Sequence, residues 1–371
     1  MPAPRPAVST IPPATHGSRD YSELRRLGLN PAEVVDFSSN TNPYGPHPAV
    51  VQAVRAATSD TALAHYPDRD CLALRAALAA TDDLAPEHIL PGNGVTELIY
   101  LVASAFVWPG SRHLILSPTF GEYSRAIHLA GGILYEHRPQ TLNNLTLKAE
   151  EVVAIIRRVQ PDGVWFCNPN NPTGQLWTPE ELADLYAADS KQRMLWVIDE
   201  SYRHFVARSV NWPDHAPSNL IRLRSLTKDY SLAGLRLGYA VAAPELMSAL
   251  RAAQPPWSVN SLAQVAGVAA LQPEVIAWRE QTLAQLQGDA AVLWTDLSGL
   301  GMTILPTTTT FALAAVEDAA LFRRWLLQDG LLVRDCASFG LPGYIRIAAN
   351  RPEANRQLVR AIAVERQPVK E

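Results

Sequence analysis

Lys228 and Arg236 are the residues of this chain whose types and spacing most clearly suggest chemistry. Lys228 ends the turn Ser225-Leu226-Thr227-Lys228, which follows a largely apolar run at 220–223 that is typical of a buried strand. Lysine forms imines with aldehydes, and its pKa shifts readily on desolvation. Ser225, Thr227 and Arg236 would supply hydroxyl and guanidinium donors for a phosphate. An aldehyde that carries a phosphate is pyridoxal 5′-phosphate (PLP); the alternative is an ordinary surface lysine.

A carboxylate stands at the end of a second apolar run. Asp199 follows residues 195–198, and Tyr202 comes three residues later. In a PLP site, such a carboxylate would keep the pyridine nitrogen protonated, so that the ring withdraws electrons from the substrate. Tyr202 could donate a hydrogen bond to the cofactor's phenolic oxygen. The simpler alternative is an aspartate that caps the turn after a strand.

Three further loops follow or precede apolar runs. The most specific is 168–174, Asn-Pro-Asn-Asn-Pro-Thr-Gly, whose prolines and glycine fix an irregular loop around Asn171. Gly94 lies in a run of small residues that opens a helix, where backbone N–H groups can bind a phosphate. Phe120 and Tyr123 follow a strand and could stack on a ring, although aromatic residues at strand ends more often belong to the core.

Arg334 and Arg346 lie within two otherwise apolar segments near the end of the chain. An arginine inside a strand needs a partner, because burying an unpaired charge is unfavourable. The partner is either a salt-bridging carboxylate or an anionic group of the substrate, held by both guanidinium nitrogens.

The elements that would position these residues alternate between strand and helix. Buried strands are expected at 113–116, 163–167, 195–198, 220–223 and 238–242, and helices at 96–106, 122–130, 149–159 and 178–188. This alternation predicts an α/β fold with a mostly parallel sheet, whose site lies beyond the carboxyl ends of the strands. A long helical region at 261–297 follows, then strands at 309–316, 331–336 and 344–348 with helices at 318–327 and 352–364.

The second half of this pattern predicts a smaller α+β domain. We expect an N-terminal arm and segment, 1–45, that joins the small domain, then a large domain, 46–255, and a small C-terminal domain, 256–371.

Composition excludes several classes of protein. The chain has 371 residues, 47% hydrophobic and 18% charged, with a net charge of −4 and no long run of either sign, so neither nucleic acid nor membrane is expected as a partner. Its three cysteines have no metal-binding spacing and fit a reducing compartment. No apolar run reaches the ~20 residues that span a bilayer, and residues 1–15 lack the layout of a signal peptide. We therefore expect a cytoplasmic protein without a metal.

Together the polar residues resemble a known family. Asn171, Asp199, Tyr202, Lys228 and Arg236, in this order, resemble the fold-type I PLP enzymes, the aspartate aminotransferase superfamily. The resemblance covers nearly the whole chain from His16 onward. It implies a PLP cofactor and a homodimer.

The resemblance also implies a role for each residue. Lys228 would be the Schiff-base lysine and proton carrier, with Asp199 and Tyr202 as the other catalytic residues. The cofactor would be held by Gly94, Val95, Thr96, Phe120 or Tyr123, Asn171, Asp199, Tyr202, Ser225, Lys228 and Arg236, and by Tyr66 of the neighbouring subunit. The phosphorylated amino acid substrate would be bound by His16, Gly17, Asn40, Asn171, Arg334 and Arg346.

Two families within the superfamily are similar to this chain: histidinol-phosphate aminotransferase and the threonine-phosphate decarboxylase of cobalamin synthesis. The stretches 36–43, 92–99, 118–123 and 256–260 are more similar to the decarboxylase. The stretch 42–46 is closer to the aminotransferase, and Asp229 stands where an aromatic residue is usual. We expect decarboxylation of L-threonine O-phosphate to 1-amino-2-propanol phosphate, with transamination of histidinol phosphate as the alternative. A non-catalytic PLP-binding regulator is disfavoured, because no basic helix-turn-helix segment precedes Tyr66.

Overall fold

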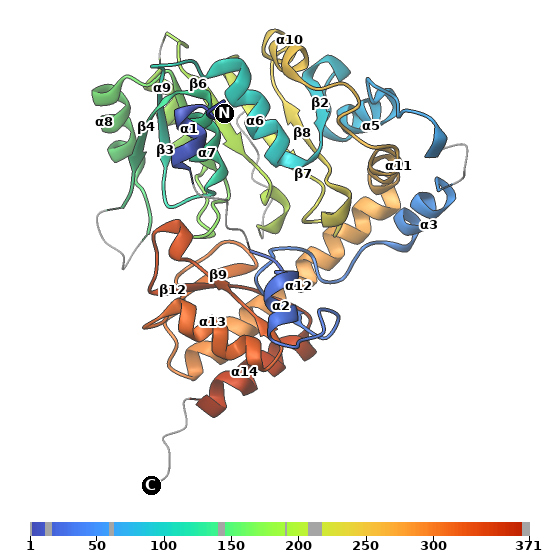
Figure 1. Cartoon of the computed structure of the whole chain (residues 1–371), viewed down its shortest axis with the longest axis vertical. Helices are drawn as coiled ribbons and strands as arrows, with labels where there is room; N and C mark the ends of the chain where they lie inside the picture. The colour runs from blue at the N-terminus through green and yellow to red at the C-terminus, as the bar shows by residue number, and fades with distance from the viewer. Residues whose placement is uncertain are drawn as a thin grey trace.

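The computed structural model describes residues 2–11, 17–58, 63–139, 145–189, 191–206 and 217–365. A large sheet with its helices forms the upper part of the molecule, and a smaller sheet lies below it, coloured orange to red in Figure 1. The predicted stretch at His16 lies outside the described residues. No helix in the described ranges is long and apolar enough to cross a bilayer.

Within the described residues the large sheet has seven strands in the order β2-β8-β7-β6-β5-β3-β4. Of these seven strands, β8 alone runs in the opposite direction to the others, so it is antiparallel to both β2 and β7. The predicted α/β fold with a mostly parallel sheet is therefore confirmed. The strands are β2 (Ile89–Gly92), β3 (Arg112–Leu116), β4 (Ile133–His137), β5 (Gly163–Cys167), β6 (Leu195–Asp199), β7 (Leu220–Ser225) and β8 (Gly238–Val241).

Helices cover both faces of this sheet because successive strand residues are buried on opposite sides. Trp165 belongs to the core shared with α6 (Gly94–Phe106), α7 (Glu122–Ala130) and α10 (Pro244–Ala253). Its neighbours Val164 and Phe166 pack under α8 (Ala149–Val159) and α9 (Pro179–Ala187). Helix α9 begins with a capping box between Thr178 and Glu181. This double burial explains the continuously apolar strand sequences.

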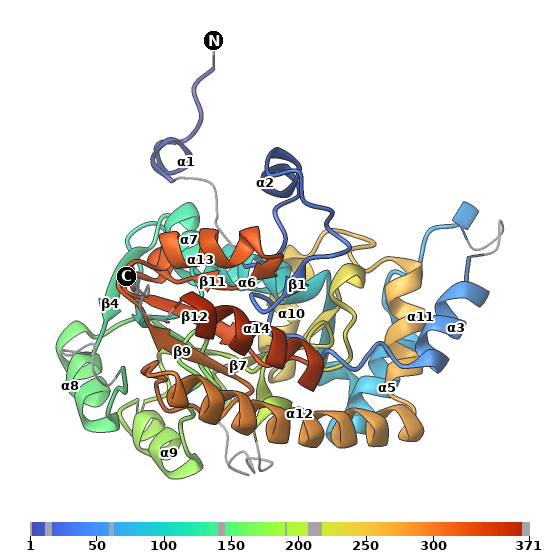
Figure 2. The ribbon, with the colours of Figure 1, turned by 90° about the horizontal axis from the view of Figure 1, so that it is seen from below.

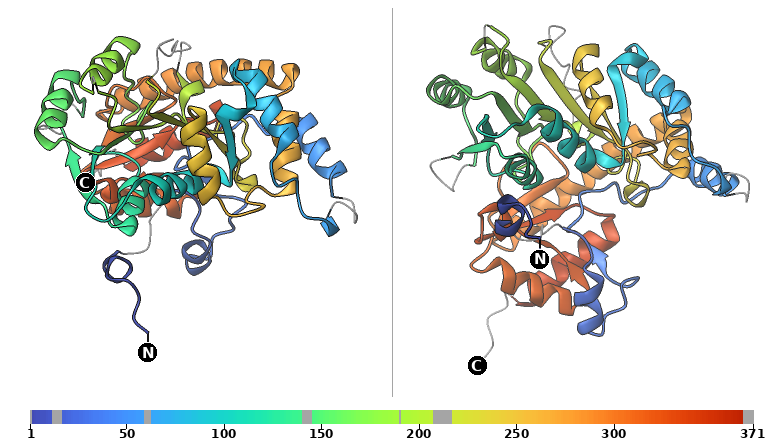
Figure 3. Two further views of the ribbon diagram at one scale, coloured as in Figure 1. Left: turned by 90° about the horizontal axis from the view of Figure 1, so that it is seen from above. Right: turned by 45° about the horizontal axis from the view of Figure 1, so that its top comes forward.

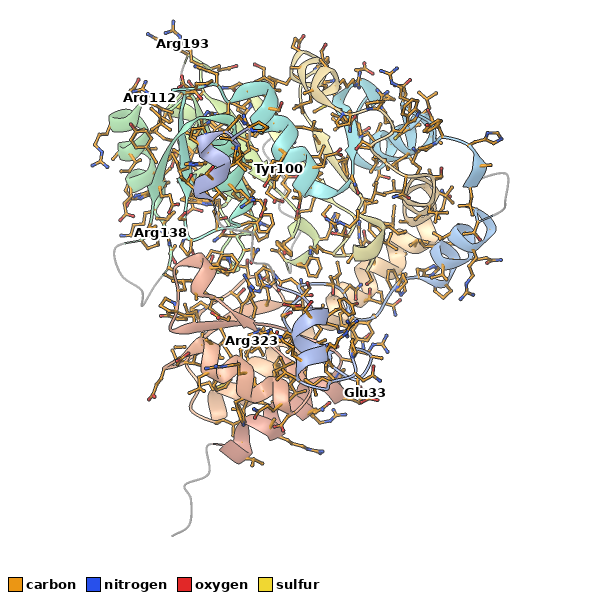
Figure 4. The ribbon with its side chains drawn as sticks, in the orientation of Figure 1. Glu33, Tyr100, Arg112, Arg138, Arg193 and Arg323 are labelled. Carbon is orange, nitrogen blue, oxygen red and sulfur yellow. The ribbon has the colours of Figure 1, made fainter. Side chains whose placement is uncertain are left out.

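The small sheet is antiparallel, in the order β11 (Arg334–Asp335), β12 (Tyr344–Ala348), β9 (Phe311–Ala315), with α13 (Ala319–Gln328) and α14 (Pro352–Glu365) beside it. β1 (Val35–Asp36) pairs in parallel with β10 (Leu331–Leu332). Through Leu24, α2 (Tyr21–Arg26) packs on α13 and β10. Arg323, labelled on α13 in Figure 4, donates to both carboxylate oxygens of Glu23. The N-terminal segment thus packs against the small sheet.

Two helices replace the single long helical region expected at 261–297. Helix α11 (Ser261–Ala270) packs against α3 (Pro48–Ala56) and α5 (Leu72–Asp82), and α12 (Pro273–Gly299) crosses the molecule as its longest helix (Figure 2). Pro273 separates them, because a proline lacks the N–H that an ongoing helix needs but suits a first turn. A short helix, α1 (Pro6–Thr10), lies outside these layers (Figure 3). The two boundaries between the three expected domains stay a prediction.

Candidate active site

A cavity of about 990 Å³ lies beyond the carboxyl ends of the large sheet's strands, between them and the small sheet. A second cavity of about 90 Å³ reaches the ends of β5, β6 and β7 and the start of α6. Lys228 lines both. The location agrees with the expectation for a parallel sheet.

Lys228 lies in the turn after β7 and has an unusually acidic ammonium group. Burial, together with the Arg346 and Arg236 guanidinium groups, lowers the pKa of Lys228 to about 8, against the opposing charges of Asp199 and Asp36. A lysine with this pKa is partly neutral near physiological pH. It can therefore act as a nucleophile or a base without a large pH change.

Asp199 ends β6 and is 4% exposed. Its Oδ1 accepts a hydrogen bond from the backbone N–H of Ser201 (2.9 Å), and its Oδ2 accepts one from the hydroxyl of Tyr123 (2.8 Å). Burial raises the pKa of Asp199, and these donors together with the charge of Lys228 counteract that rise. The result is a carboxylate held in one orientation at the inner end of the cavity.

The loop at 168–174 is closed by its own asparagines. Asn168 accepts from the N–H of Trp177 and donates to its carbonyl, while Asn170 donates to the Pro118 carbonyl and to Thr173. These contacts leave Asn171 facing the cavity, where its Oδ1 accepts from Arg346. The predicted positioning loop thus delivers one amide to the site.

The start of α6 forms an anion cradle with Arg236. Gly94 has a φ of +77°, and a β-carbon added there would lie 2.7 Å from Nη2 of Arg236. Only glycine leaves room for this guanidinium next to the helix N-terminus, whose first N–H groups have no intrahelical acceptor. Ser225 Oγ and Thr227 Oγ1 lie 2.6 Å apart at the same cavity.

Arg334 and Arg346 face each other in register on β11 and β12. Both are buried and line the large cavity. Nη2 of Arg334 donates to Ser338 Oγ (2.7 Å), and Nη2 of Arg346 donates to the Ser38 carbonyl. Gly17 packs so closely that an added β-carbon would lie 2.8 Å from the Ser38 carbonyl and 3.3 Å from Arg334. Two guanidinium groups at one cavity are the kind of donors that bind a dianion.

Asn40 is a buried amide at the same cavity, 3% exposed. Its nitrogen and oxygen make no hydrogen bond of ordinary geometry with the residues that the structure describes, although the amide interacts with the nearby Tyr202 hydroxyl. Buried polar groups are nearly always satisfied. An amide of this kind beside two arginines therefore indicates a ligand position.

The structure brings most of the predicted site residues together. The large cavity is lined by Gly17, Asn40, Thr96, Phe120, Asn171, Tyr202, Lys228, Arg236, Arg334 and Arg346, and the smaller one adds Val95, Tyr123, Asp199 and Ser225. Tyr66 lies apart: it is 79% exposed and stacks on Trp257 with ring centroids 4.4 Å apart. An exposed Tyr66 is available to a second subunit.

Sequence reasoning missed the outer part of the large cavity. Glu122, Arg125 and His128 of α7 and Glu136 of β4 line it. Glu122 accepts a hydrogen bond from Tyr100, labelled on α6 in Figure 4 (2.6 Å). These residues are spaced as on any half-exposed helix, so their pattern contains no signal that separates them from surface charges.

Comparison with known proteins now identifies relatives. Residues 32–362 match the family model described as aminotransferase class I and II. A histidinol-phosphate aminotransferase of Moorella thermoacetica is 33% identical over 98% of this chain and 92% of its own length. Other bacterial relatives, 31% and 34% identical, have the same name.

Solved structures agree on the fold. A histidinol-phosphate aminotransferase from Sinorhizobium meliloti, in complex with pyridoxal-5′-phosphate, superposes with a TM-score of 0.84 at 24% identity over 97% of this chain and 96% of that one. An L-threonine-O-3-phosphate decarboxylase from Porphyromonas gingivalis gives a TM-score of 0.76 at 29% identity over 89% of this chain and 98% of that one.

The prediction of threonine-phosphate decarboxylation is wrong, since the full-length curated relatives are named aminotransferases. The structure gives the physical reason. Asp36 accepts hydrogen bonds from the backbone and hydroxyls of Ser38 and Ser39, and Glu97 accepts them from Asn93 N–H and from Ser258. These two acidic residues of the decarboxylase-like stretches therefore hold loops in place, whereas Asn40 and Phe120 of the same stretches line the cavity, so the resemblance of the stretches does not identify the reaction.

Proposed function

The chain belongs to the class I and II aminotransferases, a family of PLP-dependent enzymes, and on that premise we propose that it moves the amino group of histidinol phosphate to 2-oxoglutarate. The amine becomes the matching ketone, and the 2-oxo acid becomes glutamate. The observation that carries the proposal is the pair Arg334 and Arg346, in register on neighbouring strands and open to the same cavity as Lys228.

The donors at the start of α6 fit the phosphate of PLP. The backbone N–H groups of Gly94, Val95 and Thr96, the guanidinium of Arg236 and the hydroxyl of Ser225 converge on the smaller cavity and its rim. A β-carbon at position 94 would fill that space. Helix N-termini bind phosphate in this manner without further charged groups.

The inner end of the cavity fits the pyridine ring. Asp199 supplies a buried carboxylate for the ring nitrogen, Asn171 and Tyr202 supply polar groups for the phenolic oxygen, and Phe120 supplies an aromatic face. When bound, PLP supplies an electron sink for the carbon that bears the substrate amine.

Lys228 provides the movable proton. Its pKa of about 8 lets Nζ give and accept protons near neutral pH, and it offers the amine to which the cofactor aldehyde would be joined. Burial and the charges of Arg346 and Arg236 disfavour the ammonium form, which keeps Nζ nucleophilic. Asn42 stabilises this turn through two hydrogen bonds. Its backbone N–H donates to the Lys228 carbonyl (2.9 Å), and its side-chain Nδ2 donates to the Asp229 carbonyl (3.1 Å).

Arg334 and Arg346 would bind the substrate's phosphate, with Gly17 and Asn40 beside them. Bidentate guanidinium contacts suit a phosphate dianion better than a single ammonium does. A phosphate held there fixes the distance from the anionic group to the reacting carbon. The arginine pair thus favours amines with one phosphate over unphosphorylated amines.

A homodimer would complete the site through Tyr66. This residue is exposed and stacked on Trp257, whose φ of +58° is unusual for a tryptophan. A hybrid dimer tests the idea. Mixing Lys228→Ala and Tyr66→Ala chains creates one site with both residues intact, so activity should recover to a fraction of the wild type. Failure to recover would place Tyr66 outside the partner's site.

Glutamate formation from histidinol phosphate and 2-oxoglutarate tests the activity. Histidinol without phosphate is the matched control and should react far more slowly. Arg334→Gln should raise KM for histidinol phosphate but leave the reaction of histidinol unchanged. Equal rates with both amines, or carbon dioxide release from threonine phosphate without glutamate, would contradict the proposal.

A further inference from the structure

Tyr123 makes a buried hydrogen bond through its hydroxyl, whereas the sequence suggested that its ring could stack on the cofactor. It lies on α7, is 1% exposed, and its hydroxyl donates to Oδ2 of Asp199 at 2.8 Å. Its ring meets Phe120 edge-on, with centroids 5.8 Å apart and planes at 77°. Of the two aromatics, Phe120 reaches the large cavity, whereas Tyr123 lies deeper beside the carboxylate.

The groups around Asp199 decide how Tyr123 can act. The elements packed around Asp199 each contribute a titratable group: Tyr123 on α7, Cys167 on β5, Tyr202 after β6 and Lys228 after β7. Burial and the nearby carboxylate raise the pKa of Tyr123 well above its usual value, so its O–H keeps its proton. Tyr123 can therefore only donate to Asp199, and a donor stabilises the ionised carboxylate.

We propose that Tyr123 is a positioning residue for the cofactor, which holds Asp199 ionised and oriented toward the pyridine nitrogen. The proposal rests on PLP binding as proposed above. Ser201 fixes Oδ1 through its backbone N–H, and Tyr123 fixes Oδ2 through a side chain. Substituting Tyr123 removes the second contact and leaves the contacts that Ser201 makes through its backbone N–H and hydroxyl in place. Without it, Asp199 would turn more freely and take up a proton at higher pH.

Tyr239 offers a matched control. It is also buried, and its hydroxyl donates to a carboxylate oxygen, Asp82 Oδ2, at 2.8 Å, but it lines neither cavity. Tyr239→Phe thus removes an equivalent hydrogen bond away from the site.

The test is the binding of PLP to apoprotein, followed by absorbance across a range of pH. Tyr123→Phe should weaken binding about 10- to 100-fold, the range for a hydrogen bond to a charged group. Its loss of binding on acidification should also begin at a higher pH. Tyr239→Phe should bind PLP as the wild type does. Tyr123→Leu, which also lacks the hydroxyl, serves if the first variant does not fold.

A PLP analogue with carbon in place of the ring nitrogen separates this effect from simple packing. The wild type should prefer PLP over the analogue, and Tyr123→Phe should lose most of that preference. An unchanged preference, or equal weakening in Tyr239→Phe, would overturn the proposal. The readout needs no amino donor, so it holds even if histidinol phosphate proves not to be the substrate.

Discussion

Asp199 and Glu200 follow one another at the end of β6, but their carboxylates lie on opposite sides of the sheet. The same division occurs on β7, where Ser225 faces the cavity and Arg224 faces away. Side chains alternate along a strand, so adjacent residues necessarily serve different surroundings. The two sides can be compared because they share the same backbone.

The side away from the cavity is a buried ion-pair network. Nε of Arg224 donates to Glu200 (2.7 Å), and its Nη1 pairs with Asp82 (2.6 Å). Arg222 lies 3.5 Å from Glu200, and Arg203 lies 3.6 Å from Asp82. These charges raise the pKa of Arg224 despite its burial. Each buried charge in this network has an opposite charge at hand.

The side facing the cavity has a less balanced arrangement of charges. Lys228 is buried close to two other cations, and the Asn40 amide makes no hydrogen bond of ordinary geometry with the described residues. Groups of this kind lower the stability of the protein alone and are retained where a ligand completes them. The ends of β6 and β7 therefore present reactive groups on one side of the sheet and structural ion pairs on the other.

Lys228→Ala should cause the largest loss of activity. Turnover should fall by about 10⁴-fold or more, the upper range for a proton-transferring group. The melting temperature of the apoprotein should stay the same or rise, because a desolvated ammonium is removed. Steady-state kinetics and thermal unfolding measure the two effects. A large loss of stability would mean that Lys228 also supports the fold.

Glu200→Gln should affect the other side and leave the reaction intact. Removing one charge from a buried pair destabilises a protein by about 3–5 kcal/mol. Turnover per folded molecule should not change, since Glu200 lines neither cavity. Glu353→Gln, at an exposed pair with Arg356, is the control and should leave denaturant unfolding unaltered. A loss of turnover per folded molecule in Glu200→Gln would show that the ion-pair side also takes part in the reaction.

The pH dependence of cofactor attachment sharpens the comparison. Only the neutral amine attacks an aldehyde, so attachment to the apoprotein should accelerate with rising pH and level off above the Lys228 pKa of about 8. Below that value the rate should change about tenfold per pH unit. A small model amine with an ordinary pKa is the control and should keep accelerating. A plateau only near the model amine's pKa would show that Lys228 is not desolvated.

Asn40→Ala should have the smallest effect. KM for the amino donor should rise up to about tenfold, as for the loss of one hydrogen bond. Stability should fall little, because the amide makes no hydrogen bond of ordinary geometry and only interacts with the nearby Tyr202 hydroxyl. Kinetics and thermal unfolding of the same preparation check both. A drop in melting temperature with unchanged KM would assign Asn40 to the scaffold.

Buried strands were the part of the fold that the sequence predicted best. Buried strands have largely apolar sequences, so 163–167 of the parallel sheet and 344–348 of the small antiparallel sheet were found with their bounds as in the structure. β4 was missed because it is a half-exposed edge strand, and β2 because a proline and a glycine end its short sequence. Such strands depend on their neighbours more than on their own residues.

Most residues that meet at the cavity could be named from the sequence, whereas their roles stay a prediction and the expected reaction was wrong. Asp199, Lys228 and Arg236 each follow or flank a strand, and a chemical type at a strand end is visible in the sequence. What Tyr123 contacts depends on how α7 packs over β5 and β6, and the sequence alone could not separate it from Phe120. Substrate choice depends likewise on a cavity built from segments far apart in the chain.

Because the cavity is built from segments at the two ends of the chain, it can form only late in the synthesis of the enzyme. Ser38 and Arg346, joined by a hydrogen bond, are 308 positions apart, and β1 pairs with β10. Contacts across so long a loop form late, because its closure entropy must be met first. A ribosome must therefore release nearly all of the polypeptide before this pocket can close, and nascent chains should be unable to trap the vitamin.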